Sequence, residues 1–266
     1  MKVPVYGLNG EAKGDVSLAK AFSRPVRTDV IKKAVLAEQA RKRQPYGSDP
    51  LAGQRTSAKY KGRRGIRGSM MNREMARMKR ITAGGYLRMR ARFVPQAVKG
   101  RRAHPPKAEK NWLKKINKKE RTLALVSAIS GTADKELITG RGHLIDGVKH
   151  IPLVLDDRFQ ELKKNKEVVA TLAALGLEPE LGRCSETKTR AGRGKTRGRR
   201  TIRKKGPLIV ISEDKGIVKA AKNIAGVDVS DIKSLEVSSL APGTAPGRLT
   251  IWTKSAASAA DKLAGG

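Results

Sequence analysis

Two segments carry most of the positive charge of this 266-residue chain, and they limit how the chain can fold. Residues 44 to 103 contain 16 lysines and arginines against Asp49 and Glu74, a net charge of +14. Residues 183 to 205 contain 11 against Glu186, a net charge of +10. The rest of the chain carries only +10 of the total formal charge of +34. Because like charges repel, such segments need an anionic partner before they can become compact.

The first basic segment does not have the composition of a domain. It is interrupted by Pro45, Pro50 and Pro95 and by eight glycines, and its apolar residues are sparse. Ordering a residue costs about 1–2 kcal/mol of backbone entropy, and few apolar contacts are available here to offset that cost. We therefore expect residues 44–103 to be disordered in isolation and to become ordered on a partner. Folded back on itself, the segment could reach at most about 100 Å, at roughly 3.3 Å per residue.

Each basic segment also has local features. A short helix is predicted from Met70 to Arg80, with methionines on one face and arginines on another. The second segment, residues 183–205, has no periodic apolar residue in its glycine-rich stretch from Arg190 to Arg200, and it is interpreted as a loop. Glycine lacks a side chain, so the backbone of such a loop can approach phosphates closely.

Nucleic acid is the polyanion that best fits this charge. The guanidinium group pairs phosphate through two hydrogen bonds and can stack on bases, and each neutralised phosphate releases counterions. A solvated charge run without a ligand is the competing interpretation. The predicted RNA-binding residues are Arg55, Lys59, Lys61, Arg63, Arg64, Arg67, Arg73, Arg77, Lys79, Arg80, Arg88, Arg90, Arg92, Lys99, Arg101, Arg102, Lys188, Arg190, Arg193, Lys195, Arg197, Arg199, Arg200, Arg203 and Lys204.

The remaining residues predict an α/β domain. Two apolar runs, Ile151–Leu155 and Pro207–Ile211, each precede an acidic pair and a helical pattern, which is typical of parallel strands alternating with helices. Further elements are expected as follows: a strand over 3–6, a helix capped by Asp29, a helix over 118–133 with Leu123, Val126 and Ile129 buried, edge strands over 235–240 and 249–253, and a helix over 254–263.

These elements predict one α/β domain with a mostly parallel sheet flanked by helices. Residues 1–43 and 104–266 would form this globular body. The long extended basic loop of residues 44–103 would interrupt it, and residues 183–205 would form a second basic loop.

Two glycine-containing motifs are too weak to indicate a nucleotide site or a known RNA module. Gly194-Lys195-Thr196 resembles part of a phosphate-binding loop, but Thr189 stands where that motif needs glycine, and the preceding stretch is polar. The Gly62–Gly65 stretch matches a two-glycine RNA clamp, yet it lacks the flanking pattern and is better explained as a turn.

No catalytic or metal-binding constellation is apparent. Asp156-Asp157 and Glu213-Asp214 follow strands, where we expect them to cap the next helices rather than to catalyse. The three histidines His104, His143 and His150 have no zinc-like spacing with Cys184, so we expect them to face solvent or RNA. We predict no cofactor, no metal, no small-molecule substrate and no enzymatic activity.

A membrane surface is the rival anionic partner. No apolar run approaches the roughly 18 residues of a membrane-spanning helix, and the N-terminus lacks the apolar core of a signal peptide. A single cysteine excludes an internal disulfide framework. We therefore expect a cytoplasmic protein. A free-standing regulator that binds nucleic acid is the alternative, but no half-site geometry or recognition helix is evident.

Several motifs resemble the universal large-subunit ribosomal protein four family in its archaeal and eukaryotic form. They are Val94-Pro-Gln-Ala-Val-Lys-Gly100, Ala103-His-Pro-Pro106, Lys119-Glu-Arg121, Arg141-Gly-His143, Glu186-Thr-Lys188, Ala191-Gly192, Arg197-Gly-Arg199, Leu240-Ala-Pro-Gly243 and Ala245-Pro-Gly-Arg-Leu-Thr250. The last two are the most specific, and together the matches span nearly the whole chain.

This resemblance implies a structural constituent of the large ribosomal subunit. It implies that the body lies on the outside, bound to large-subunit ribosomal RNA and to neighbouring ribosomal proteins. It further implies that the extended loop threads inward and helps to form the exit tunnel of the nascent peptide. The segment Gly62 to Gly68 is then the expected neighbourhood of the tip.

Overall fold

The computed structural model describes residues 1–263, and the chain divides into two units. The first, which we call the body, comprises residues 1–42 together with the chain from residue 113 onward. The second, which we call the insertion, comprises Arg43–Trp112. Every helix and strand within the described residues belongs to the body.

The body is built on a six-stranded sheet with the order β2-β1-β3-β8-β6-β7. All neighbouring strands pair in parallel except β2, which is antiparallel to β1 at one edge, so the predicted mostly parallel sheet is confirmed. The strands are β1 (Lys2–Tyr6), β2 (Ala12–Ser17), β3 (Leu153–Leu155), β6 (Leu208–Ile211), β7 (Asp228–Asp231) and β8 (Thr250–Thr253).

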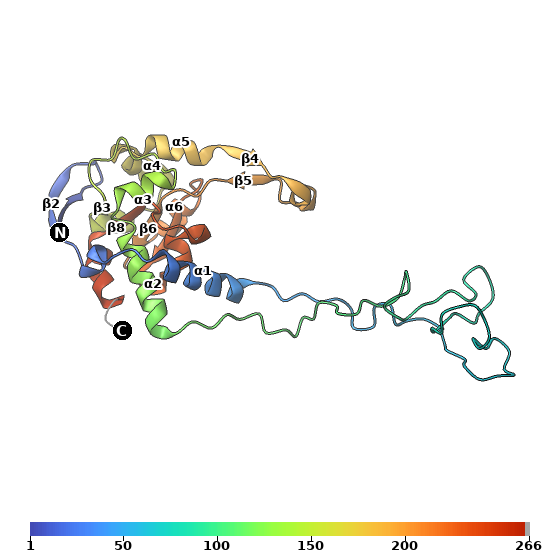
Figure 1. Ribbon diagram of the computed structural model, residues 1–266. Coiled ribbons are helices and arrows are strands. Elements are labelled where there is room, and N and C mark those ends of the chain that lie inside the picture. The colour runs from blue at the N-terminus through green and yellow to red at the C-terminus, as the bar shows by residue number, and fades with distance from the viewer. Residues whose placement is uncertain (264–266) are drawn as a thin grey trace. The chain divides into compact units, whose positions relative to one another are not determined.

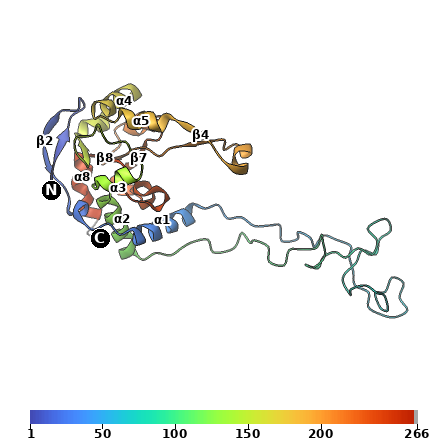
Figure 2. The same ribbon diagram turned by 45° about the horizontal axis from the view of Figure 1, so that its top comes forward.

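Helices cover both faces of this sheet (Figures 1 and 2). On one face lie α1 (Thr28–Lys42), α2 (Lys118–Ser130), α7 (Val237–Leu240) and α8 (Lys254–Ala259). On the other lie α3 (Lys135–Gly140), α4 (Asn165–Ala174) and α6 (Ile217–Lys222), with α5 (Glu178–Ser185) following α4.

Side-chain alternation along the buried strands divides the core into two clusters. Leu208 and Val210 of β6 pack with α1 and α2, whereas Ile209 and Ile211 pack with α4 and α6. Successive side chains of a strand point to opposite faces, so a strand covered on both faces must be apolar throughout. This explains why the continuous apolar runs in the sequence mark the central strands.

Three expectations for the body are wrong. Leu249–Thr253 was expected at an edge, but β8 lies between β3 and β6 in the middle of the sheet. Within residues 235–240, Val237–Leu240 form the short helix α7, and the strand at that edge is instead the polar β7. Leu123 is 37% exposed, because α2 turns Ala124, Val126 and Ile129 toward the core instead.

The start of α7 shows why residues 235–240 do not form a strand. The Glu38 carboxylate accepts hydrogen bonds from the backbone N–H groups of Val237 and Ser238, at 3.2 and 2.8 Å. Glu38 lies on α1, about 200 residues away in sequence, so a distant side chain satisfies the first N–H groups of the helix.

Residues 187–203 form a β-hairpin, and the stretch interpreted as a loop, Arg190 to Arg200, connects its two strands. Strands β4 (Thr187–Thr189) and β5 (Thr201–Arg203) pair antiparallel, and a 3-10 turn over Gly192–Arg197 closes the end. Gly198 follows with φ +77°, a conformation that glycine adopts without strain. In both ribbon views the hairpin projects away from the sheet of the body (Figures 1 and 2).

The helix predicted from Met70 to Arg80 is absent, and these residues form turns. Asn72 has φ +52°, which a right-handed helix cannot contain. The methionine stripe also lacks a surface to pack on: Met70 is buried, but Met75 is 37% exposed. Amphipathic helices gain most of their stability from such packing, and the insertion does not supply it.

Candidate nucleic-acid interface

The insertion consists of two limbs and a tip. The limb leaving residue 43 and the limb returning to residue 112 lie side by side (Figure 1), and the Ser48 N–H donates to the Pro106 carbonyl oxygen at 3.0 Å. At Gly53, with φ +74°, the Arg101 Cα would lie 2.7 Å from an added Cβ, so the limbs approach too closely for a side chain.

Backbone hydrogen bonds hold the tip with little apolar burial. Lys59 and Arg80 exchange two N–H to carbonyl bonds of 3.0 and 3.1 Å, and Arg80 also bridges Ala91. Ala58, Met70 and Ile81 are the buried apolar residues of the insertion within the described chain. Three such side chains do not offset the ordering entropy of about seventy residues.

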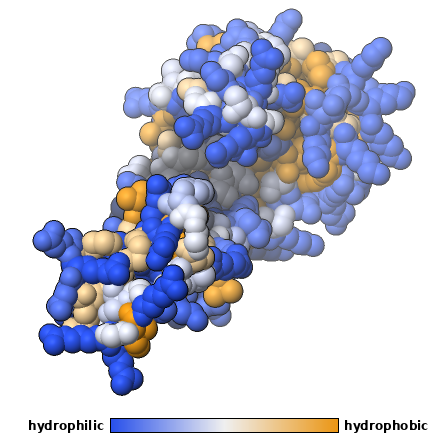
Figure 3. Space-filling view, turned by 90° about the vertical axis from the view of Figure 1, so that its right-hand side faces the viewer, coloured by the Kyte–Doolittle hydropathy of each residue, from blue (hydrophilic) through white to orange (hydrophobic). Residues whose placement is uncertain are grey.

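None of the 25 predicted RNA-binding residues is buried, and most are exposed. Figure 3 shows long hydrophilic side chains projecting from the surface of the molecule. Within the described residues, their salt bridges to acidic side chains are Arg55 with Asp49 and Lys204 with Glu186. The charges of the two basic segments are therefore largely left for an external anion.

Two of the predicted residues use their side chains for hydrogen bonds to backbone carbonyl oxygens of their own segment. The Arg80 guanidinium donates to the carbonyl oxygens of Met89 and Ala76, at 2.8 and 2.9 Å. The Arg190 side chain donates to the Arg199 carbonyl oxygen at 2.9 Å, across the hairpin. These two side chains therefore help to set the backbone conformation of the insertion and of the hairpin.

A buried polar cluster that sequence reasoning missed lies at the base of the hairpin. His143, expected to face solvent or RNA, is only 3% exposed, and its Nδ1 lies 2.7 Å from Oε1 of Glu180. Glu180 is fully buried and accepts two hydrogen bonds from Arg183, which is mostly buried as well. The i, i+3 spacing of Glu180 and Arg183 on α5 is the one sequence signal that could have revealed this pair.

The hydrogen bonds of this cluster control its ionisation. Burial alone would raise the pKa of Glu180, but the hydrogen bonds from Arg183 and His143 outweigh it and lower the pKa to about 2. For Cys184, burial and the nearby Glu180 carboxylate raise the pKa to about 11. A thiol that stays protonated is a poor nucleophile and a poor metal ligand.

The same cluster anchors the returning end of the hairpin. Arg183 Nη2 donates to the Lys205 carbonyl oxygen at 2.8 Å, and the buried Arg248 donates to the carbonyl oxygen of the adjacent Gly206, also at 2.8 Å. Arg248 is in turn paired with Asp228 at 2.7 Å. Arginines in the body therefore fix where the exposed arginines of the hairpin project.

At the carboxyl edge of the sheet, where α/β enzymes bind ligands, Asp157 and Asp214 make hydrogen bonds within the protein itself. Asp214 accepts from the backbone N–H groups of Gly216 and Val218 at the start of α6, which confirms its capping role. Asp157 instead accepts from the backbone and hydroxyl of Ser255, at the start of α8. The sequence predicted that Asp157 caps the helix that follows it in the chain, but Asp157 caps α8 instead.

The remaining sequence motifs have structural roles. Gly194-Lys195-Thr196 lies in the turn of the hairpin, without the strand and helix that a phosphate-binding loop requires. The Gly62–Gly65 stretch lies in turns, as expected. Within residues 1–263, no group of three or more histidine, cysteine or acidic side chains is arranged to hold a metal ion. In the same range, no helix is long and apolar enough to cross a membrane.

Comparison with known proteins gives consistent matches along nearly the whole chain. The sequence model of the Ribosomal protein L4/L1 family matches residues 16–263. The large ribosomal subunit protein uL4 of Nanoarchaeum equitans is 46% identical over 260 residues, covering 96% of each chain. The protein of the same name from Archaeoglobus fulgidus is 46% identical over 257 residues, again covering 96% of each. That from Haloquadratum walsbyi is 45% identical, covering 96% of this chain and 97% of the relative.

Proposed function

Because the chain belongs to the ribosomal protein L4/L1 family, whose members are structural and not enzymatic, we propose that it binds large-subunit ribosomal RNA through the insertion and the hairpin. As a member of this family, the chain is a structural constituent of the large ribosomal subunit. RNA binding by the two segments is supported by one observation: their exposed cations greatly outnumber their carboxylate partners.

The two segments hold neighbouring RNA helices together by neutralising the negative charge of their phosphates. Guanidinium groups make charge-assisted hydrogen bonds to phosphate oxygens, and the release of condensed counterions favours binding. These contacts position RNA without reading its sequence. The insertion has so few buried apolar residues that RNA, rather than a core, supplies the stability of its bound form.

Ultraviolet crosslinking in cell extract tests the RNA partner. We expect large-subunit ribosomal RNA to be recovered on peptides from the insertion and from the hairpin. Recovery of messenger RNA or DNA instead would favour a free-standing regulator in the cytoplasm over a ribosomal constituent.

We further propose that the tip of the insertion helps to form the exit tunnel of the nascent peptide, with Gly62 to Gly68 nearest to it. Support comes from the family and from the tip's glycines, which let the backbone approach a neighbour closely. In stalled ribosomes whose nascent chain carries a photoreactive side chain, we expect crosslinks to residues 62–68. Crosslinks confined to the body would contradict this placement.

We also propose that residues 1–43 and 104–266 fold as one domain without the basic loop of residues 44–103. Both core clusters consist of body residues, so deletion removes none of that packing. A variant that lacks Tyr46 to Lys99 should keep a cooperative melt by circular dichroism and should assemble poorly into subunits. Loss of the cooperative melt would reject this division of the chain.

A further inference from the structure

One group of aromatic side chains in the insertion is not used for packing a core. The chain has only nine aromatic residues, and two of them, Tyr46 and Trp112, meet where the two limbs of the insertion begin and end. Their ring centroids are 5.1 Å apart at an interplanar angle of 39°. Yet Tyr46 remains 53% exposed, so part of its ring is available to a ligand.

The tyrosine ring is held in place from one side. The Arg43 guanidinium carbon lies 4.7 Å from the Trp112 ring centroid and 5.4 Å from that of Tyr46. The Trp112 indole N–H donates to the Ala108 carbonyl oxygen at 3.1 Å. Gly47 allows the limbs to meet here, because the Ala108 nitrogen would lie 2.5 Å from an added Cβ. In the ordered limbs, these contacts set the orientation of the Tyr46 ring.

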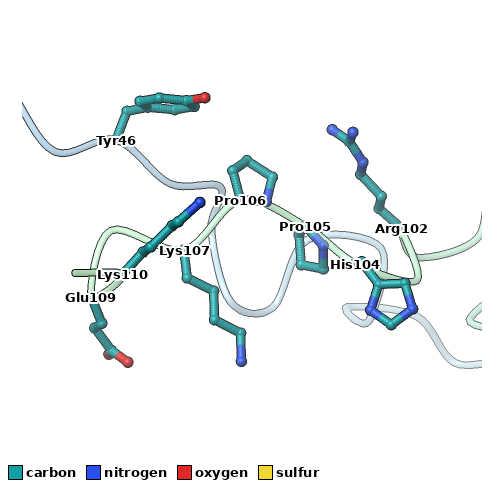
Figure 4. Close-up of a pocket in the computed structure, with 8 residues that line it drawn as sticks. All are labelled: Tyr46, Arg102, His104, Pro105, Pro106, Lys107, Glu109 and Lys110. Atoms are coloured by element: carbon teal, nitrogen blue, oxygen red, sulfur yellow. The ribbon is translucent and has the colours of Figure 1, made fainter. Parts of the chain in front are cut away.

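A cavity of about 630 Å³ opens beside Tyr46. Its walls carry Arg102, His104, Pro106 and Lys107, and Figure 4 shows Tyr46, Pro106 and Arg102 extending to the same side of the limbs. A second cavity of about 740 Å³, farther along the limbs, shares the wall formed by Arg102, Pro106 and Lys107. Volumes of about 300–1,000 Å³ are typical of sites for ligands of nucleotide size.

We propose that this cavity receives one unpaired RNA nucleotide, whose base stacks on Tyr46 while Arg102 contacts an adjoining phosphate. Exposed aromatic rings beside arginines and lysines are the side chains that hold splayed-out bases, and stacking tolerates any base because every base has a π face. The site rests on the proposed RNA-binding function and adds to it a contact that depends on an aromatic ring rather than on charge alone.

A bulged RNA tests the site with the full-length protein. The probes are a 30-nucleotide RNA hairpin with one bulged adenosine and the same hairpin without the bulge. We expect the wild type to bind the bulged hairpin more tightly than the other. Tyr46→Leu should lower the affinity for the bulged hairpin by roughly 5- to 100-fold, the range for removing one base–aromatic stack, and so abolish the preference. Tyr46→Phe keeps the ring and should keep the preference.

Two controls separate stacking from a merely structural role of Tyr46. Leucine retains apolar packing against Trp112. If Tyr46 only held the two limbs together, Tyr46→Leu would therefore leave the preference for the bulged hairpin unchanged. Tyr86, 82% exposed beside Arg90, offers a matched substitution at the tip, and Tyr86→Leu should keep the preference. If both leucine variants lost it equally, the cavity would not be the site.

The outcomes distinguish this site from the proposed function. If the wild type bound both hairpins equally and with strong salt dependence, the stacking site would be overturned and RNA binding would stand. If the wild type bound neither hairpin, both the stacking site and the proposed RNA binding would be rejected. As a second readout, a 5-iodouridine placed in the bulge should crosslink to residue 46 on irradiation, and crosslinks elsewhere in the chain alone would also overturn the site.

Discussion

Arg183 and Glu180 form a two-pronged ion pair at the base of the hairpin. Arg183 Nε lies 2.7 Å from Oε2 of Glu180, and its Nη2 lies 2.6 Å from Oε1. Glu180 is fully buried, so this carboxylate depends on its partners for the hydrogen bonds that water would otherwise supply. Because Arg183 also donates a hydrogen bond to the Lys205 carbonyl oxygen, the pair links the core of the body to the hairpin.

Replacing Glu180 by glutamine should destabilise the body. The substitution keeps the shape but leaves the mostly buried Arg183 without its counter-charge. Breaking one side of a buried ion pair lowers the free energy of unfolding by about 3–5 kcal/mol. Urea denaturation followed by circular dichroism measures this change. Glu178→Gln, on the same helix but exposed, is the matched control and should change stability by less than about 0.5 kcal/mol. Equal effects of the two substitutions would contradict the role of the pair.

The lowered pKa of Glu180 predicts an acid-labile body. In the unfolded chain this carboxyl group titrates near its ordinary pKa of 4.5, and in the folded protein near 2. Between these values the unfolded state binds more protons, so stability is complete above about pH 4.5 and is lost as the pH falls toward 2. The linked loss is on the order of 3 kcal/mol. Urea midpoints from pH 6 to pH 2 should fall more steeply for the wild type than for Glu180→Gln, and parallel curves would refute this assignment.

The position of charge, rather than its amount, should govern RNA affinity. We expect Arg193→Gln, Arg197→Gln and Arg199→Gln combined to lower affinity for large-subunit ribosomal RNA and to reduce the slope of log affinity against log salt by about 2–3. The control removes the same charge from exposed lysines of α4 and α6: Lys166→Gln, Lys219→Gln and Lys222→Gln. Filter binding from 50 to 300 mM salt gives both slopes. A slope reduced equally in the two variants would mean that only net charge matters.

Sequence predicted two of the central strands because burial on both faces leaves a plain pattern. The runs Ile151–Leu155 and Pro207–Ile211 are apolar at consecutive positions, as strands covered on both faces must be. Strand β2 has no such pattern, since nearly all of Ala12–Ser17 is exposed and only its pairing with β1 makes it a strand. Helix α7 depends on Glu38 from a distant helix, which no local pattern can show.

For the candidate interface, charge density pointed to the two segments but not to the role of each residue. Arg80, Arg190 and Arg183 look like their neighbours in the sequence, yet each donates to backbone carbonyl oxygens and shapes the chain. His143 was misplaced because its partner, Glu180, is 37 residues away and meets it only in the folded body.

Amide hydrogen exchange of residues 44–103, measured with and without large-subunit ribosomal RNA, shows whether RNA orders this segment. We expect these amides to exchange within seconds in the free protein and to be slowed at least about tenfold by RNA, because RNA supplies the contacts that a core would otherwise provide. Amides of α2 and β6 should stay protected in both states. Strong protection of residues 44–103 in the absence of RNA would show that the segment is ordered without its partner and would overturn this explanation of its charge.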